Sequence, residues 1–283
     1  MKILVTGARG QLGYDICRVL AERGVPHRGI DIEELDLTNE QAVQVYLNEY
    51  RPDALIHCAS FTAVDKAEDD AARCYAINAD ATRSLAKCCA DLGAKMLYIS
   101  TDYVFAGDGT QPHTEDEPAQ PLSVYGKSKL MGEEYVRELL PAHFIVRISW
   151  LFGINGSNFV RTMLRLSQTK SEISVVNDQI GSPTYSYDLA HLLCDIILTD
   201  RYGTYHASNE GFCSWAEFAA EIMRVSGSDT EIRPIPSDEY PSRATRPHNS
   251  RLDKSRLKEA GFTPLPHWKD ALLRYLNELS SLQ

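Results

Sequence analysis

The sequence opens with Met1-Lys2-Ile3-Leu4-Val5-Thr6-Gly7-Ala8-Arg9-Gly10-Gln11-Leu12-Gly13, which contains the most informative pattern in the chain. The apolar run at residues 3–5 is typical of a buried strand, and apolar residues recur at helical spacing between residues 12 and 20. Backbone N–H groups at the start of a helix carry partial positive charge, which suits a pyrophosphate. The stretch therefore predicts a strand, a glycine turn and a helix that together bind a dinucleotide.

The three glycines of this turn, Gly7, Gly10 and Gly13, differ from the standard dinucleotide fingerprint. Their spacing is Gly-x-x-Gly-x-x-Gly, whereas the fingerprint is Gly-x-Gly-x-x-Gly. A tight turn without a ligand is the alternative interpretation. The position of the turn favours a cofactor site, because glycines there admit the phosphates and let the helix pack closely on the strand.

Composition and charge narrow the classes of function. The chain has 283 residues, of which 43% are hydrophobic and 24% charged, as in an ordinary globular protein. Its net charge of −10 argues against nucleic acid or an anionic membrane as the main partner. We see neither an apolar run near the roughly 20 residues that span a bilayer nor a signal-peptide pattern. The seven cysteines are scattered without metal-ligand spacing, so we expect reduced thiols in the cytoplasm.

Strand and helix patterns alternate along the first half of the chain. We expect further strands at residues 26–31, 53–59, 95–100 and 144–148, separated by helices at residues 40–50, 70–92 and 123–139. The strands are apolar on both faces, which is typical of a parallel sheet covered by helices on both sides. The sequence therefore predicts an α/β fold with a Rossmann-type doubly wound sheet, whose dinucleotide-binding domain covers residues 1–150.

The pattern changes after residue 150. Shorter elements are expected there, with helices at residues 159–166, 215–225 and 268–279 and strands at residues 173–176 and 203–207. A segment rich in Pro and Arg lies at residues 233–249. We expect residues 151–283 to form mainly a smaller α/β substrate-binding domain, with part of residues 170–205 packing back on the main sheet.

Polar residues with catalytic potential follow the fourth and fifth strands, where doubly wound folds bind their ligands. Tyr125 and Lys129 are four residues apart, so they share one face of a helix. A nearby ammonium lowers the pKa of a phenol, and the Thr101 hydroxyl at the end of a strand can hydrogen-bond a carbonyl oxygen. An exposed Tyr–Lys pair without function is the alternative. Together with the glycine turn, the three residues predict hydride transfer at a carbonyl group.

Several motifs carry a resemblance to a known family. The chain resembles the extended short-chain dehydrogenase/reductases, and among them the family of dTDP-4-dehydrorhamnose reductases. The resemblance rests on the glycine turn, on Thr101 and Tyr125-x-x-x-Lys129, and on residues 62–68, 100–105, 177–184 and 246–250. It extends from residue 1 to about residue 280.

The resemblance implies a reaction, the NAD(P)H-dependent reduction of the C4 keto group of dTDP-4-dehydro-L-rhamnose in dTDP-rhamnose biosynthesis for cell-surface polysaccharide. Tyr125 would donate the proton, Lys129 would hold the nicotinamide ribose, and Thr101 would polarise the keto oxygen. Thr101, Asp102 and Trp150 match positions that contact the sugar nucleotide. The implied cofactor contacts are Gly7, Gly10, Gln11, Leu12, Gly13, Asp31, Asp36, Leu37, Ser60, Phe61, Thr62, Tyr125 and Lys129. Residues 246–251 would add polar contacts, although an ordinary structural turn is the alternative there.

Cofactor choice and metal binding depend on a few further residues. Asp31 favours a free ribose 2′-OH and hence NAD, whereas Arg9 and Arg28 could offset it by pairing with a 2′-phosphate. Because the family uses NADPH and tolerates NADH, we expect NADPH. Some family members form a magnesium-linked dimer through acidic residues. Here Asp15 stands at one such position but Tyr187 at another, so we expect no required metal and leave monomer or homodimer open.

Two other functions stay open on the sequence alone. An epimerase or dehydratase of the same fold is the nearest alternative, although Asp102 is followed by Tyr103 and not by the acidic residue expected of a dehydratase. A non-catalytic NADP-binding regulatory subunit is the second. The presence of Thr101, Tyr125 and Lys129 favours the enzyme.

Overall fold

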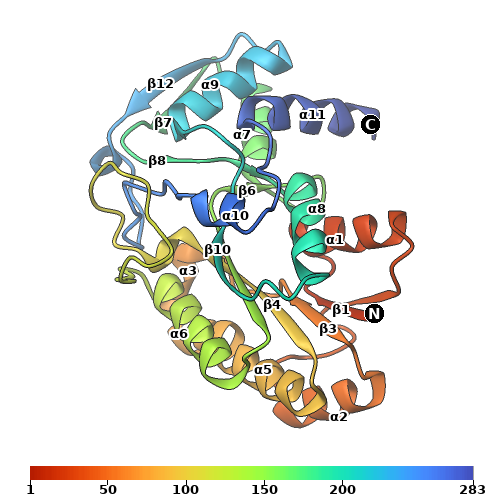
Figure 1. Ribbon diagram of the computed structural model, residues 1–283. Coiled ribbons are helices and arrows are strands. Elements are labelled where there is room, and N and C mark those ends of the chain that lie inside the picture. Colours follow the sequence, from red (N-terminus) through yellow and green to blue (C-terminus); the bar gives the residue numbers. More distant parts are fainter. Residues whose placement is uncertain (283) are drawn as a thin grey trace.

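The computed structural model describes residues 1–282, and its centre is a six-stranded sheet (Figure 1). The strand order is β10-β5-β4-β3-β1-β2, and every neighbouring pair is parallel. The strands are β1 (Ile3–Thr6), β2 (His27–Ile30), β3 (Ala54–His57), β4 (Lys95–Thr101), β5 (His143–Ile148) and β10 (Gly203–His206). The order reverses between β1 and β3, which is where open α/β sheets bind their ligands. The predicted Rossmann-type parallel sheet is confirmed.

Helices cover both faces of this sheet. Helices α1 (Gln11–Glu22) and α8 (Ser186–Ile197) pack together on one face, in a core that takes Ile3 and Val5 from β1. The core on the other face takes Leu4 from the same strand and receives α2 (Glu40–Tyr50), α5 (Ala81–Leu92) and α6 (Val124–Leu139). Successive side chains of a strand point to opposite faces, so a sheet buried on both sides needs strands that are apolar throughout.

The helical region that we expected at residues 70–92 is divided in the structure. It consists of α4 (Ala71–Tyr75), a π-helical turn η1 (Ala76–Asp80) and α5, and α3 (Val64–Asp69) precedes it. The π turn contains the buried Asn78. The Asn78 carboxamide accepts hydrogen bonds from the Ser60 hydroxyl and the Phe61 backbone N–H, and it donates one to Ser128. This turn therefore ties the loop after β3 to α6.

The second part of the chain builds a separate apolar core. Helices α7 (Phe159–Ser167), α9 (Trp215–Ser226) and α11 (Trp268–Ser281) contribute to it, together with the parallel pair β7 (Glu172–Val176) and β12 (Glu231–Ile235). Strand β12 falls partly in the segment rich in Pro and Arg. The remaining short elements are η2 (Asp102–Val104), β6 (Leu151–Phe152), β8 (Ile180–Gly181), β9 (Thr184–Tyr185), β11 (Cys213–Ser214), η3 (Ser237–Glu239) and α10 (Ser255–Glu259).

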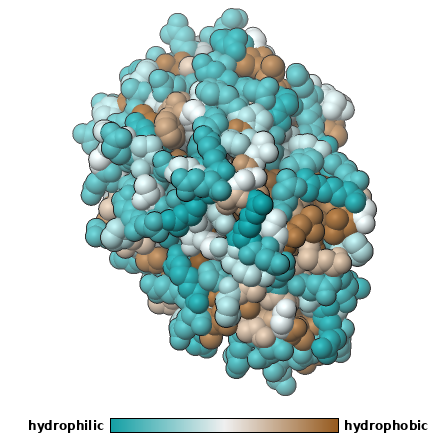
Figure 2. Space-filling model, in the orientation of Figure 1, coloured by the Kyte–Doolittle hydropathy of each residue, from teal (hydrophilic) through white to brown (hydrophobic). Residues whose placement is uncertain are grey.

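Residues 186–206 leave this second core and return to the main sheet. Helix α8 packs on α1, and β10 adds a parallel strand beside β5. Strand β7, in contrast, pairs within the second part. The division of the chain at residue 150 into two domains stays a prediction. Among residues 1–282 no helix is long and apolar enough to cross a membrane. Figure 2 shows hydrophilic residues over most of the visible face, with hydrophobic ones in small groups.

Candidate active site

A cavity of about 950 Å³ lies at the carboxyl ends of β1, β3, β4 and β5. Its wall combines the loop after each of these strands with residues of the second part of the chain. The lining comprises Thr6, Gly7, Arg9–Gly13, Ile30–Ile32, Leu35–Thr38, Cys58–Ser60, Thr62, Val64, Arg73, Ala76, Ile77, Ile99–Tyr103, Tyr125, Lys129, Ile148, Trp150, Leu151 and Trp215. Parallel strands bring their ends to one edge of the sheet, so segments distant in sequence meet here.

The glycine turn forms the cradle that a dinucleotide phosphate needs. A Cβ atom added at Gly13 would lie 2.2 Å from the Gly7 carbonyl oxygen, so only glycine fits there. Gly7 itself has a φ of +66°, a conformation that glycine adopts readily. Gly10 caps α1 without a side-chain hydrogen bond, which leaves the first N–H groups of the helix free for an anion. The residues present therefore fit a bound dinucleotide.

Tyr125 and Lys129 lie one turn apart at the start of α6, both with less than a tenth of their surface exposed. Ser123 caps this helix by accepting a hydrogen bond from the Gly126 N–H. The Thr101 side chain lies close enough to the Tyr125 hydroxyl to lower its pKa. The Thr101 hydroxyl in turn donates to the Asp102 carboxylate over 2.9 Å. The structure thus brings the three predicted catalytic residues to one end of the cavity.

Burial controls the ionisation of this group. It raises the pKa of Tyr125 above its ordinary value, and the nearby Thr101 side chain offsets this only in part. It also lowers the pKa of Lys129 to about 7, against the attraction of Glu133. The Lys129 ammonium lies 4.0 Å from the centre of the Tyr98 ring. The pKa of Tyr125 is therefore raised and not lowered toward neutral as we expected, because burial dominates. Tyr125 is a neutral phenol that keeps a proton to donate.

Asp102 is a buried carboxyl group at the same end of the cavity. Only 3% of its surface is exposed, and burial raises its pKa to about 6. Its Oδ1 atom accepts the bond from Thr101, whereas Oδ2 makes no hydrogen bond of ordinary length and angle within residues 1–282, although the Ser250 side chain lies near enough to lower the pKa of the carboxyl. A buried oxygen without a partner is costly unless a ligand supplies one. Asp102 is therefore suited to contact a bound substrate.

Two stacked tryptophans line the same cavity. Trp150 and Trp215 have ring centroids 3.7 Å apart and nearly parallel planes. The φ of Trp150 is +48°, which is rare for a bulky residue. Gly181 packs against the Trp150 ring, where an added Cβ would lie 2.7 Å from a ring carbon. Trp215 was not among the predicted site residues, because it begins α9 far along the chain and no motif marks it.

All the cofactor and substrate positions that the sequence analysis named line this cavity except Phe61. The Phe61 ring packs near Tyr125 in a small apolar cluster. Residues 246–251 also lie outside the lining. There, Arg246 pairs with Asp65 over 2.7 Å, and the Asn249 carboxamide donates to the carbonyls of Asp108 and Gln111.

The positions that we compared with magnesium ligands lie between α1 and α8, away from the cavity. The buried Asp15 accepts a hydrogen bond from Ser186, and burial raises its pKa to about 6. The Tyr187 hydroxyl donates to Glu22, and its ring packs under the Arg18 guanidinium. Within residues 1–282, no group of three His, Cys, Asp or Glu side chains is arranged to hold a metal ion.

Comparisons with known proteins agree over the whole chain. The family described as RmlD substrate binding domain matches residues 1–281. The spore coat polysaccharide biosynthesis protein SpsK of Bacillus subtilis is 44% identical, with 99% of this chain and 98% of that protein covered. A dTDP-4-dehydrorhamnose reductase of Streptomyces griseus is 42% identical, with 95% of this chain and 91% of that protein covered.

A solved structure of a relative contains the cofactor. The dTDP-4-dehydrorhamnose reductase of Bacillus anthracis in complex with NADP is 43% identical. It superposes with a TM-score of 0.96, covering 98% of this chain and 99% of that one. The chain therefore belongs to the RmlD substrate-binding family, which includes the dTDP-4-dehydrorhamnose reductases.

Proposed function

We propose that this protein uses NADPH to reduce the C4 keto group of dTDP-4-dehydro-L-rhamnose, which yields dTDP-L-rhamnose. The observation that carries the proposal is the single cavity that holds both the glycine cradle and the Tyr125–Thr101–Lys129 group. The names of the relatives supply the sugar nucleotide, and the Bacillus anthracis complex supports NADP as the cofactor.

Each residue has a chemical task in this reaction. Bound NADPH supplies a hydride for the keto carbon. Tyr125, held as a neutral phenol, donates its proton to the keto oxygen, and the Thr101 hydroxyl hydrogen-bonds the same oxygen. Lys129 binds the nicotinamide ribose, and its charge favours the tyrosinate that the proton transfer leaves behind. These steps require the two side chains to share one oxygen of the substrate, which their proximity in the cavity lining supports.

The remaining contacts divide between cofactor and sugar nucleotide. The glycine turn, Gln11, Leu12, Asp31, Asp36, Leu37, Ser60 and Thr62 would hold the cofactor. Asp102 and Trp150 would contact the sugar nucleotide, with Trp215 supporting Trp150 from the second part of the chain. We further propose a cytoplasmic enzyme that requires no metal and binds neither nucleic acid nor membrane, since it carries a net charge of −10.

Replacement of Tyr125 tests the proposed reaction. Tyr125→Phe removes the proton donor and retains the ring, so we expect kcat to fall by roughly 10²–10⁴-fold with little change in cofactor affinity. The rate is measured as loss of NADPH absorbance when dTDP-4-dehydro-L-rhamnose is supplied, and affinity as quenching of tryptophan fluorescence.

Tyr135→Phe is the matched control, because Tyr135 lies on the same helix and its ring packs under Arg83. It should retain the wild-type rate. A wild-type rate in Tyr125→Phe would overturn the mechanism. Sugar conversion without net NADPH oxidation would indicate an epimerase instead.

A further inference from the structure

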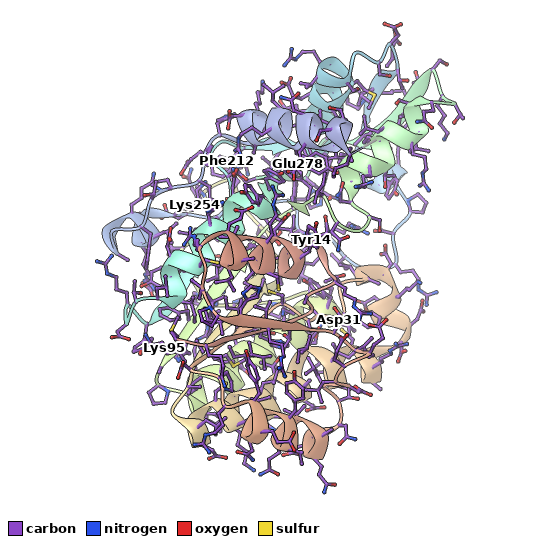
Figure 3. All side chains as sticks on the ribbon, turned by 90° about the vertical axis from the view of Figure 1, so that its right-hand side faces the viewer. Tyr14, Asp31, Lys95, Phe212, Lys254 and Glu278 are labelled. Atoms are coloured by element: carbon purple, nitrogen blue, oxygen red, sulfur yellow. The ribbon has the colours of Figure 1, made fainter. Side chains whose placement is uncertain are left out.

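An acidic rim lies where the adenosine ribose of a dinucleotide is expected in this fold. It consists of Asp31, Glu33 and Glu34, which directly follow β2. Figure 3 places Asp31 beside the end of the front strand of the sheet. An acidic residue at this position of a Rossmann unit hydrogen-bonds the ribose 2′-OH, whereas a 2′-phosphate needs a cation. Three carboxylates without a counter-charge would repel the 2′-phosphate of NADPH.

The structure distinguishes the two arginines that the sequence offered as counter-charges. The Arg28 guanidinium lies 4.6 Å from the centre of the Tyr50 ring and interacts with Tyr46. Tyr46 and Tyr50 belong to α2, and Arg28 is absent from the lining of the cavity. Arg28 is therefore directed to the helix layer and not to the cofactor cavity.

Arg9, in contrast, lies on the cavity wall and touches the whole acidic rim. Its backbone N–H donates to Asp31 Oδ2 over 2.9 Å. Its guanidinium bridges the carboxylates of Glu33 and Glu34. Glu34 also accepts a hydrogen bond from the Asp31 N–H, which closes a small network around Arg9. The Arg9 carbonyl accepts a bond from Asn155, so the turn is also held from the second part of the chain.

The Arg9 ion pairs can exchange for another anion at low cost. The side chain of Arg9 is 57% exposed, and those of Glu33 and Glu34 are 61% and 42% exposed. Ion pairs in this environment contribute little to stability. A phosphate offers a guanidinium a charge-assisted, bidentate interaction that is stronger than an exposed ion pair. A phosphate on the neighbouring ribose would therefore compete for the guanidinium.

We propose that Arg9 is the ligand of the cofactor 2′-phosphate and that its guanidinium pairs with Glu33 and Glu34 when this phosphate is absent. Arg9 with its two glutamate partners then sets the preference between NADPH and NADH. With NADH bound, Arg9 neutralises the rim and Asp31 faces the free ribose. With NADPH bound, the guanidinium transfers from the glutamates to the phosphate. The inference rests on the proposed use of a nicotinamide cofactor and adds the residues that choose it.

Binding of two nucleotides without nicotinamide isolates this interaction. We would measure the affinities of 2′,5′-ADP and 5′-AMP by calorimetry, because the two differ only in the 2′-phosphate. Arg9→Gln should weaken 2′,5′-ADP roughly tenfold, or about 1.4 kcal/mol, and leave 5′-AMP unchanged. The double variant Glu33→Gln/Glu34→Gln should strengthen 2′,5′-ADP several-fold, because it removes both the competing partners and the repulsion. The ratio of NADPH to NADH affinity should follow the same order.

Arg28→Gln is the matched control and should alter neither affinity, since it removes the same charge from the neighbouring helix layer. An unchanged preference for 2′,5′-ADP in Arg9→Gln, or its loss in Arg28→Gln, would overturn the inference. Failure of the wild-type protein to bind either nucleotide or NADPH would instead overturn the proposed function. A melting temperature for each variant identifies loss of fold.

Discussion

Lys129 shows how burial decides the chemistry of a single residue. The sequence placed it one helical turn from Tyr125, and an ammonium there lowers the pKa of a phenol. In the folded protein both side chains are buried, so each is held toward its neutral form. For a reduction this is useful at Tyr125, because the protonated phenol is the form that donates. For Lys129 it means that the charge is present only part of the time near neutral pH.

The lowered pKa of Lys129 predicts a pH dependence. The residue is charged below about 7 and neutral above it, so the group loses its charge as the pH rises. We expect kcat/KM for NADPH to decrease above pH 7, so that a plot of its logarithm against pH approaches a slope of −1. This parameter reports the ionisation of the free enzyme. The measurement is initial rate against pH between about 7 and 9, where Asp102, with its pKa of about 6, is already ionised.

Lys129→Met should give a low rate without this slope. A wild-type profile that stays flat across the range would show that the charge of Lys129 is either retained in the free enzyme or unused.

At the scale of elements, the cavity is built from loops that one sheet edge brings together. The glycine turn after β1, the loop after β3 and η2 after β4 all lie at carboxyl ends of parallel strands. Trp215, in contrast, arrives on α9 from the second core and stacks on Trp150. Trp150 has a positive φ, and its ring packs against both Gly181 and Trp215.

Removal of the Trp215 ring should weaken binding of the sugar nucleotide without weakening binding of NADPH. Trp215→Ala is expected to raise KM for the sugar nucleotide about three- to tenfold, since an aromatic pair contributes roughly 0.5–1.5 kcal/mol beyond its buried area. The Kd of NADPH should stay unchanged because the glycine cradle is untouched. Steady-state kinetics and fluorescence titration measure the two quantities.

The control is Phe212→Ala, which removes an exposed ring just before α9. It should leave both values unchanged. Equal losses of sugar and cofactor affinity in Trp215→Ala would contradict the role of Trp215 at the sugar end alone.

At the scale of the whole molecule, a buried ion pair joins the layers beneath the active site. Arg147 on β5 makes a bidentate contact with Glu133 on α6, with N–O distances of 2.9 and 2.7 Å. Arg147 also reaches His206 on β10 and the Glu115 carbonyl. Burial and the nearby Arg147 lower the pKa of His206 to about 3, so this histidine stays neutral. The network joins a helix, two strands and a loop that are distant in the sequence.

Breaking one half of this pair should destabilise the fold strongly. Arg147→Met leaves the Glu133 carboxylate without its bidentate partner, and we expect the free energy of unfolding to fall by roughly 3–5 kcal/mol. Arg137 also contacts Glu133, but it is partly exposed and reaches only one oxygen. Urea denaturation followed by circular dichroism measures the change.

The double variant Glu133→Leu/Arg147→Met removes both charges and should lose less stability than the single variant. A double variant that is less stable than Arg147→Met would contradict this account of the pair.

Local patterns were sufficient to predict strands β1 to β5 and the polar residues at their carboxyl ends. The apolar strands, the glycine turn and the Tyr125–Lys129 spacing each depend on residues close together in the chain, and the ends of parallel strands must meet at one edge. The cavity lining therefore includes Gly13, Thr101 and Asp102 as expected.

Contacts between segments that are distant in the sequence could not be predicted from local patterns. The stacking of Trp215 on Trp150, the π turn at Asn78 and the ion pairs of Arg9 all join segments that meet only after folding. The same holds for ionisation, because the pKa values of Tyr125 and Lys129 depend on burial from every side. The spacing of residues selects which groups can react, whereas the surrounding protein sets their charge and their partners.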